Sequence, residues 1–356
     1  MIPPPPIFPW VIPGSAVAPS PIEAGPGLVA ALERSDWLRL APAGATEWIH
    51  FIILAPGVSV LVNLSLGAGS AAEPASPRLL LLARTDRWWG DAEEYPRHLV
   101  DVRQGRVDVA FASNSVRLIP EGYRIRAALR DGSVKLDVVV RPLTLPLLAL
   151  RLPLGRAGDL SWLAVPRLVA RGAVEVDGRC YSLDGAPAYH DHNWGRFDWG
   201  ADLGWEWAVI LPDGAPSPWT VLVVRLGSRS RGRIHAEGIW LWRDGVLARS
   251  WRGEAVTWHS EGYRRVASLP TVPGAWASLA PGLATGIPGR LVAQGEAGGD
   301  HLRIELHPED PLRIVAAQGD GHTLLHEASA RACVSGQVAG VPVWMEGRGV
   351  LEVANG

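Results

Sequence analysis

Apolar and polar residues alternate with a period of two along much of the chain, and this alternation constrains the fold more than any other feature. Successive side chains of a β-strand point to opposite faces, so the pattern predicts strands with one buried face. It is clearest in residues 58–66, 106–111, 123–127 and 134–140. Only residues 27–39 have the pattern of a short helix. The sequence therefore predicts an all-β, antiparallel protein of the sandwich or barrel type.

Asp-Gly pairs separate many of these segments and predict tight hairpin turns. Both residues tolerate the positive φ angles that such turns require. The pairs are Asp131-Gly132, Asp177-Gly178, Asp184-Gly185, Asp213-Gly214 and Asp244-Gly245.

Three short patterns occur twice in the same order, which indicates an internal duplication. Glu47-Trp48 recurs as Glu206-Trp207, and the Glu-Gly-Tyr-Arg string at residues 121–124 recurs at residues 261–264. A glycine series that ends at Gly185 recurs as one that ends at Gly347. We therefore expect a proline-rich arm with a short helix and two β-domains, which cover residues 1–39, 40–196 and 197–356. A ligand would then occupy either the mouth of one domain or the cleft between the two.

The composition narrows the class of protein. The net charge is −2 and the basic residues are scattered, which argues against a nucleic-acid partner. The two cysteines, Cys180 and Cys333, cannot build a disulfide framework, so we expect a reduced, cytoplasmic setting. The proline-rich N-terminal residues lack the charged region of a signal peptide, and no run of about 18 apolar residues predicts a membrane span.

A polar cluster, residues 189–194, lies at the end of the first copy. When the two glycine series are aligned, His190 falls opposite Glu352 and Asp191 falls opposite Val353, where the second copy ends. On this alignment the cluster is an addition at the junction of the two copies. An added group of polar residues is a candidate for chemistry.

We predict that the cluster is a strand, so that its side chains alternate between two faces. One face would carry Tyr189, Asp191 and Asn193, and the other would carry His190, His192 and Trp194. An aspartate flanked by two histidines is suited to act as a general acid that an imidazole recharges. The alternative is a buried hydrogen-bond network that ties the domains together. His190 and His192 could also bind a metal, but they lack a third ligand at diagnostic spacing, so no metal is expected.

The chain has 17 tryptophans but only 4 phenylalanines. Many of the tryptophans fall near the two Glu-Trp pairs and the junction. Aromatic faces attract cations and give a cavity a large apolar lining. Most are expected to be core residues of a β-protein, but we take four as candidate lining of a substrate pocket: Trp48, Trp88, Trp194 and Trp205.

Other catalytic signatures are missing from the sequence. It has no nucleophile elbow, phosphate-binding loop or dinucleotide-binding glycine pattern between a strand and a helix, and no aspartate-rich run for Mg²⁺. Any enzyme chemistry is therefore expected to need no cofactor.

Three segments of the chain resemble the carotenoid 1,2-hydratase (hydroxyneurosporene synthase) family. They are Ala188-Tyr-His-Asp-His-Asn-Trp-Gly195, the Glu47-Trp48 strand and Gly347-Arg-Gly-Val-Leu-Glu352. Relatives of that family include fungal natural-product cyclases of the Diels–Alderase type and kievitone-hydratase-like proteins. The resemblance extends over residues 46–353 and implies two tandem lipocalin-like β-barrels packed side by side.

The hydratase branch implies that an acid protonates an isolated alkene to give a tertiary cation, which water captures. A relative that excludes water would let an internal alkene capture the cation and close a ring. Carried over by position, Asp191 is the proton donor, with His190 and His192 as its tuning or relay partners. The supporting or lining groups are Tyr189, Asn193 and Trp194.

Two departures from the family pattern favour a shorter terpenoid over a carotenoid. The family has a Tyr-x-Asp pair on an early strand of the second domain, whereas residues 220–226 contain neither residue. Its double aromatic in the first domain is altered here to Trp48-Ile-His-Phe51.

The sequence thus predicts a cofactor-independent terpenoid cyclase or hydratase, a lyase or isomerase, whose partner is an apolar isoprenoid or polyene. Two alternatives stay open: a pericyclase that folds a polyene without proton transfer, and a non-catalytic carrier of an apolar ligand. The apolar mouth of such a protein could also touch a membrane surface to collect its substrate.

Overall fold

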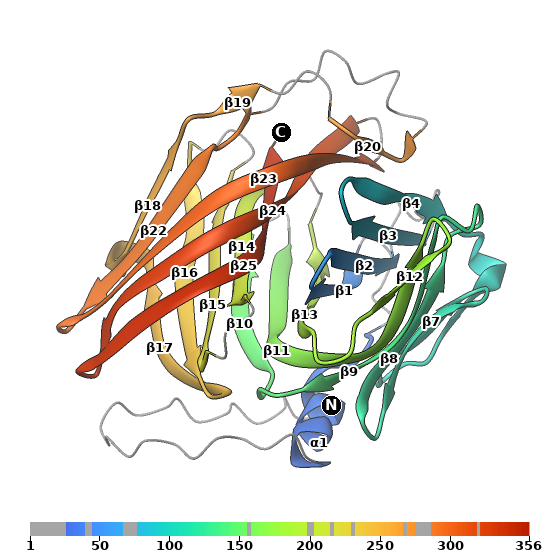
Figure 1. Cartoon of the computed structure of the whole chain (residues 1–356), viewed down its shortest axis with the longest axis horizontal. Helices are drawn as coiled ribbons and strands as arrows, with labels where there is room; N and C mark the ends of the chain where they lie inside the picture. Colours follow the sequence, from blue (N-terminus) through green and yellow to red (C-terminus); the bar gives the residue numbers. More distant parts are fainter. Residues whose placement is uncertain are drawn as a thin grey trace.

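The computed structural model describes residues 26–39, 45–66, 77–154, 158–197, 203–213, 217–228, 232–265, 269–274, 286–318 and 321–355 (Figure 1). These residues form one helix, α1 (Pro26–Ser35), two short 3-10 turns, η1 (Arg97–Leu99) and η3 (Gly253–Ala255), and two large β-sheets. The predicted all-β class is confirmed. Residues 1–25, which include most of the predicted arm, lie outside the described part.

The first sheet has 13 strands and follows the first copy of the duplication. Its central path runs in the order β4-β3-β2-β1-β13-β11-β9-β8-β7-β6-β5, and β10 and β12 pair with β11. The strands are β1 (Thr46–Ala55), β2 (Val58–Leu66), β3 (Arg78–Arg84), β4 (Trp88–Glu94), β5 (Val100–Val102), β6 (Asp108–Phe111), β7 (Asn114–Ile119), β8 (Gly122–Ala128), β9 (Val134–Pro142), β10 (Leu147–Pro153), β11 (Asp159–Val176), β12 (Arg179–Ser182) and β13 (Pro187–Arg196).

The second sheet has 10 strands and repeats the central arrangement of the first. Its order is β17-β16-β15-β14-β25-β24-β23-β22-β18, with β20 beside β23; β19 and β21 form a separate ribbon. The strands are β14 (Gly204–Pro212), β15 (Trp219–Gly227), β16 (Ile234–Arg243), β17 (Val246–Arg252), β18 (Val256–Glu261), β19 (Arg264–Arg265), β20 (Thr271–Val272), β21 (Gly286–Ile287), β22 (Arg290–Ala297), β23 (Asp300–Gln318), β24 (Gly321–Val338) and β25 (Val341–Asn355).

Each sheet curls around its own core, and the two curled sheets stand side by side (Figure 1). A third apolar cluster lies between them and takes residues from both, such as Ile52 and Trp162 from the first sheet and Trp207 and Val350 from the second. Side chains alternate along each strand, so the strands at the centre of each sheet bury both of their faces. One face packs inside its own barrel and the other packs against the neighbouring sheet.

The strand that ends each copy pairs with the Glu-Trp strand of the same copy. Trp48 lies opposite Asn193 in the β1–β13 ladder, and Trp207 lies opposite Glu352 in the β14–β25 ladder. On this register Asn193 corresponds to Glu352, and Asp191 corresponds to Val350.

The glycine-based alignment of the two copies was therefore wrong. Gly178, in the turn of the first hairpin, lies 15 residues before Asn193, whereas Gly340, in the matching turn of the second, lies 12 residues before Glu352. An alignment fixed at the turns is therefore three residues out of register at the end strands, and an odd shift moves every side chain to the other face. Each position of the polar cluster therefore has an equivalent position in β25, at residues 348–353, so the cluster is not an added segment.

Helix α1 begins at a proline, whose fixed φ angle suits the first turn of a helix, and ends at Ser35 rather than at residue 39. Its Val29 and Leu32 join the core of the first barrel. The helix and the segment that follows it thereby close one end of that barrel. At 10 residues, α1 is far too short to cross a bilayer, and no helix in the described ranges meets the length and hydropathy that a span requires.

Two of the five predicted Asp-Gly turns have positive φ at both residues, Asp177-Gly178 (48° and 75°) and Asp244-Gly245 (49° and 81°). This is the geometry of the two-residue hairpin that such pairs favour. In Asp131-Gly132 and Asp184-Gly185 only the glycine has positive φ. Gly214 lies outside the described residues.

Candidate active site between the two barrels

A cavity of about 130 Å³ lies between the two sheets, lined by residues of β1 and β13 from the first and of β14, β24 and β25 from the second. Of the two places expected for a ligand, the structure thus presents the cleft between the domains. A cavity of roughly 150 Å³ lined by apolar side chains can hold benzene. A space of this size therefore matches one end of an apolar chain rather than a whole long polyene.

Asp191 lies on the face of β13 that lines this cavity and is 6% exposed. Tyr189 Oη donates a hydrogen bond of 3.0 Å to Asp191 Oδ2, and Asn193 Nδ2 donates one of 2.8 Å to Oδ1. The three residues share one face, as the alternation predicted. Tyr189 itself is fully buried beneath the cavity wall, whereas Asn193 lines the cavity.

Burial raises the pKa of Asp191 to about 8, and the nearby carboxyl of Glu352 adds to the increase. Hydrogen bonds from Tyr189 and Trp162 act in the opposite direction and lower that pKa. The carboxyl group is therefore protonated at neutral pH. Once it loses its proton, donors are already in place on both of its oxygen atoms.

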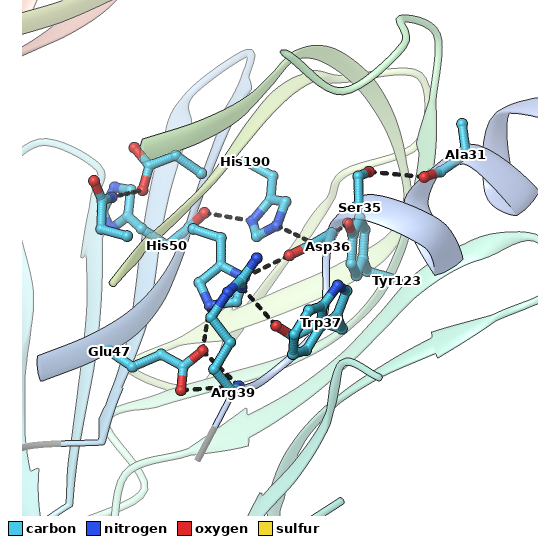
Figure 2. A network of polar contacts seen from close by, with 12 residues as sticks. Ala31, Ser35, Asp36, Trp37, Arg39, Glu47, His50, Tyr123 and His190 are labelled. Atoms are coloured by element: carbon cyan, nitrogen blue, oxygen red, sulfur yellow. Dashed lines mark hydrogen bonds and ion pairs between the residues drawn. The ribbon is translucent and has the colours of Figure 1, made fainter. Parts of the chain in front are cut away.

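His190 points to the opposite face of β13, into the first barrel, towards Asp36 (Figure 2). His192 bonds the same aspartate, and both imidazoles are fully buried. His190 bonds the backbone oxygen of His50 through Nδ1 (2.9 Å) and Asp36 Oδ2 through Nε2 (3.0 Å). His192 bonds Asp36 Oδ1 through Nδ1 (2.6 Å) and Glu47 Oε1 through Nε2 (2.9 Å). Burial disfavours the charged form of His192, but Asp36 and Glu47 outweigh it and raise its pKa.

The structure separates Asp191 from the two histidines that were predicted to act with it. The structure brings Tyr189 and Asn193 to Asp191, and it places both imidazoles on the far side of the strand, bonded to other carboxylates. Trp194 also lies on the far side, with the Arg39 guanidinium 3.4 Å from its ring centroid. The structure supports a structural role for the two histidines. All four of their ring nitrogens bond to groups other than Asp191, so neither imidazole is placed to pass a proton directly to Asp191.

Gly195, which ends the cluster, has a backbone reason to be glycine. Its φ angle is 155°, and a Cβ atom there would lie 1.9 Å from the carbonyl oxygen of Asp159 on the paired strand. Any other residue would force β13 and β11 apart beside the cavity.

Two of the four tryptophans predicted as lining, Trp48 and Trp205, do line the cavity. Trp88 does not, because its indole N–H donates to the backbone oxygen of Asp310, 2.6 Å away on the second sheet. Trp162 and Trp207 complete the aromatic wall and were not singled out from the sequence. Their positions on the interface faces of β11 and β14 were hidden until the strands were paired.

His50 is a further cavity residue that sequence reasoning missed. It lies directly opposite Asp191 in the β1–β13 ladder and is 5% exposed. Burial, followed by the nearby His190, lowers its pKa to about 3, so the imidazole is neutral. Its Nε2 atom has no hydrogen-bond partner among the described residues.

Two glutamates of the second sheet were also missed, Glu327 on β24 and Glu352 on β25. They are direct partners in the β24–β25 ladder, and both line the cavity. Burial raises the pKa of each carboxyl group. A lone glutamate inside an apolar strand such as Val350-Leu-Glu-Val-Ala354 is the signal that could have pointed to them, because charged residues are rarely buried without a purpose.

His322 and His326 have the spacing of a metal-binding pair on a helix, but both lie on strand β24. His326 is fully buried, and the side chain of His322 lies outside the described part. No group of three or more histidine, cysteine, aspartate or glutamate side chains in the described ranges is arranged to hold a metal ion.

Replacing Tyr189 by phenylalanine is expected to reduce the turnover of an Asp191-dependent reaction by about 10- to 100-fold. The variant removes a donor that lowers the pKa of Asp191, so that pKa rises and the carboxyl becomes a weaker acid. The steady-state rate and its pH profile measure this, and the alkaline limb should move to higher pH. Tyr181→Phe, on the remote strand β12, is the matched control and should keep the wild-type profile. An unchanged rate in Tyr189→Phe would mean that the hydrogen bond does not tune the acid.

Solved structures of known proteins show a similar fold, whereas comparisons of sequence find no match. No protein-family model and no curated protein sequence matches the chain. Among solved structures, a Nitrosomonas europaea protein assigned as AttH superposes with a TM-score of 0.61 at 13% identity, covering 87% of this chain and 91% of the other. Kievitone hydratase of Nectria haematococca gives 0.58 at 13% identity, with coverage of 91% and 92%. CghA gives 0.56 at 14% identity, with coverage of 88% of each chain. The chain therefore shares the two-barrel fold of these proteins along nearly its whole length.

Proposed function

We propose that this protein is a cofactor-independent enzyme in which Asp191 protonates an isolated alkene of an isoprenoid. The observation that carries the proposal is a neutral carboxylic acid at the wall of an aromatic cavity, with hydrogen-bond donors on both of its oxygens. The fold shared with a hydratase supports it. The partner is then an apolar isoprenoid or polyene whose reacting end enters the cavity.

The proposed step uses only groups of this chain. The O–H bond of Asp191 breaks, a C–H bond forms at the less substituted alkene carbon, and the other alkene carbon becomes a tertiary cation. In one route an internal alkene donates its electron pair and closes a ring, and a neighbouring C–H bond then loses its proton. In the other route water adds to the cation and loses its proton. In both routes the Asp191 carboxylate takes up the released proton, directly or through water. Either route restores the charge balance and needs no oxidant or metal.

A carboxyl group with a pKa of about 8 keeps its proton at pH 7, but it is a weak acid for an alkene. Tyr189 and Asn193 counteract this weakness, because hydrogen bonds to a charged group are worth about 1.5–3 kcal/mol each and strengthen as the carboxylate forms. The aromatic wall then stabilises the cation by about 2 kcal/mol when water is excluded. The developing carboxylate and the developing cation are thus stabilised in the transition state more than the neutral acid and alkene are in the ground state.

The competing explanations fit the site less well. A carrier of an apolar ligand has no use for buried carboxyl groups, whose desolvation costs stability. A pericyclase would use the neutral Asp191 to donate a hydrogen bond to a substrate carbonyl. The shared fold of CghA, one structure of which contains Sch210972, keeps this second candidate open.

Incubation with farnesol, geranylgeraniol, squalene and lycopene in D₂O tests the proposal. We expect a cyclic or hydrated product with one deuterium on a carbon of the skeleton, found by mass spectrometry and located by NMR. Product free of solvent deuterium would instead support the pericyclase, and tight binding of all four compounds without product would support the carrier.

A further inference from the structure

The pair Glu327 and Glu352 gives the cavity a second polar pole, on the barrel opposite to Asp191. The two residues face each other across adjacent strands, and their carboxyl groups lie within hydrogen-bond reach of each other. Trp205 donates its indole N–H to Glu352 Oε1. Glu327 has 0% exposure, and neither of its oxygens meets a protein donor among the described residues.

Two carboxyl groups within hydrogen-bond reach of each other do not both ionise, so at least one of them keeps its proton. Burial raises the pKa of Glu327 well above its usual value, and Glu352 adds to the increase. The pKa of Glu352 is also raised by burial, but Glu327 and Trp205 bond to it and lower it. Glu352, which accepts hydrogen bonds from Glu327 and Trp205, is therefore the member better able to hold a negative charge.

The groups that face this pair leave that charge without a counter-ion. Asp191 is itself an acid, and His50 is neutral with an unbonded Nε2 atom. Arg78 also lines the cavity, but its guanidinium forms an ion pair of 2.8 Å with Glu94. Burial favours the neutral form of both carboxyl groups, whereas a cation that enters from outside favours the ionised form, so the pair is suited to ionise against such a ligand.

The rest of the wall suits such a cation. Trp48, Trp162 and Trp207 line the same cavity, and an aromatic face attracts a cation that has lost its water. A carboxylate combined with aromatic walls is how proteins recognise alkylated ammonium groups. The small enclosed volume favours a compact charged centre with an apolar tail that extends outwards.

We infer that Glu352, hydrogen-bonded by Glu327 and Trp205, forms a cation-binding site that takes a tertiary ammonium group on an alkyl or isoprenoid chain. Where the proposed function holds, the same site also stabilises the carbocation, which an ammonium group mimics in charge and shape. The binding of an amine requires no turnover, so the site can be tested apart from the reaction.

The test compares N,N-dimethyldecylamine, which is protonated at pH 7, with the neutral tertiary alcohol of the same skeleton. Tryptophan fluorescence and calorimetry measure both affinities. We expect wild-type protein to bind the amine about ten-fold or more tightly than the alcohol. Equal affinity for the two ligands in wild-type protein overturns the inference, whatever any variant does.

Two isosteric variants then locate the charge. Glu352→Gln removes the charge and should abolish the preference for the amine while it leaves the affinity for the alcohol unchanged. Glu327→Gln keeps a donor beside Glu352 and should retain the preference. Glu346→Gln, an exposed position on the same strand, is the surface control. A Glu352→Gln protein that folds, as judged by its melting temperature, and still prefers the amine would refute the assignment.

The outcomes separate this inference from the proposed function. Isoprenoid turnover with solvent deuterium but no preference for the amine overturns only the cation site. A Glu352-dependent preference for the amine without any turnover supports the site and counts against the reaction.

Discussion

Replacing Asp191 by asparagine should lower isoprenoid turnover by about 10³-fold and remove solvent deuterium from any residual product. The amide has the shape of the carboxyl group, so the wall of the cavity is kept. It has no acidic proton to give, and the other two carboxyl groups of the described cavity, Glu327 and Glu352, belong to the second sheet. Product yield and deuterium content, measured in parallel with wild-type protein, check this. Undiminished deuterium incorporation in the variant would show that a group other than Asp191 donates the proton.

Asp191→Asn should also change how the stability of the protein depends on pH. Measuring this distinguishes the loss of an acid from the loss of the fold. The pKa of Asp191 rises from 3.8 to about 8 on folding, so the native state takes up a proton between these two values. Stability of the wild type that depends on Asp191 is therefore fully present below about pH 4 and is lost as the pH rises towards 8. Thermal unfolding from pH 5 to pH 9 should show Asp191→Asn to be at least as stable as wild type, with a flatter profile. Asp137→Asn, an exposed position on β9, should follow the wild-type curve.

The wild-type rate should fall as the pH rises through about 8, because the reactive form of Asp191 is the protonated one. Loss of activity and loss of stability therefore occur over the same pH range. The asparagine variant separates them, since it removes the titration that causes both.

Replacing Asp36 by alanine should destabilise the protein by about 3–5 kcal/mol, the largest stability effect that the structure predicts. Asp36 has 0% exposure and accepts hydrogen bonds from His190, His192 and Tyr123. Its removal leaves two buried imidazoles and a phenol without their shared acceptor. Urea unfolding at pH 6 measures the difference in free energy, and Asp101→Ala on the exposed side of β5 is the control.

The pH dependence of that difference follows from two opposite shifts. The pKa of Asp36 lies far below its usual 3.8 despite burial, because His190 and His192 favour its ionised form. This contribution is present above about pH 3.8 and is lost as the pH falls. The pKa of His192 is raised from 6.5, so its contribution is present below about pH 6.5 and is lost as the pH rises through its folded value. The cost of Asp36→Ala should thus be greatest between these limits. An Asp36→Ala protein as stable as wild type at pH 6 would show that the network does not hold the barrel together.

The cluster at residues 189–194 therefore serves two functions on its two faces. Its histidine face fastens the helix-to-strand segment to the first barrel through Asp36 and Glu47. Its aspartate face supplies the acid of the proposed reaction. Because one strand carries both, the position of Asp191 depends on the rigidity of the network behind it.

The local chemistry of the sequence determined the elements and their faces. The alternation in β13 placed Asp191 with Tyr189 and Asn193, because successive side chains of a strand must point apart. The Glu-Trp repeats correctly indicated two copies of one β-unit, and each marks the strand that pairs with the end of its copy.

Pairing between distant strands decided the rest. The first hairpin is three residues longer than the second between its turn and the residue that pairs with the Glu-Trp strand, and no local pattern shows where along a strand that pairing falls. His50 reaches Asp191 through the pairing of β1 with β13, and Glu327 and Glu352 reach the same cavity only because the two sheets pack against each other. The sequence by itself determined which side chains can share a face; the tertiary structure alone decided which faces meet, because that depends on long-range packing of both barrels.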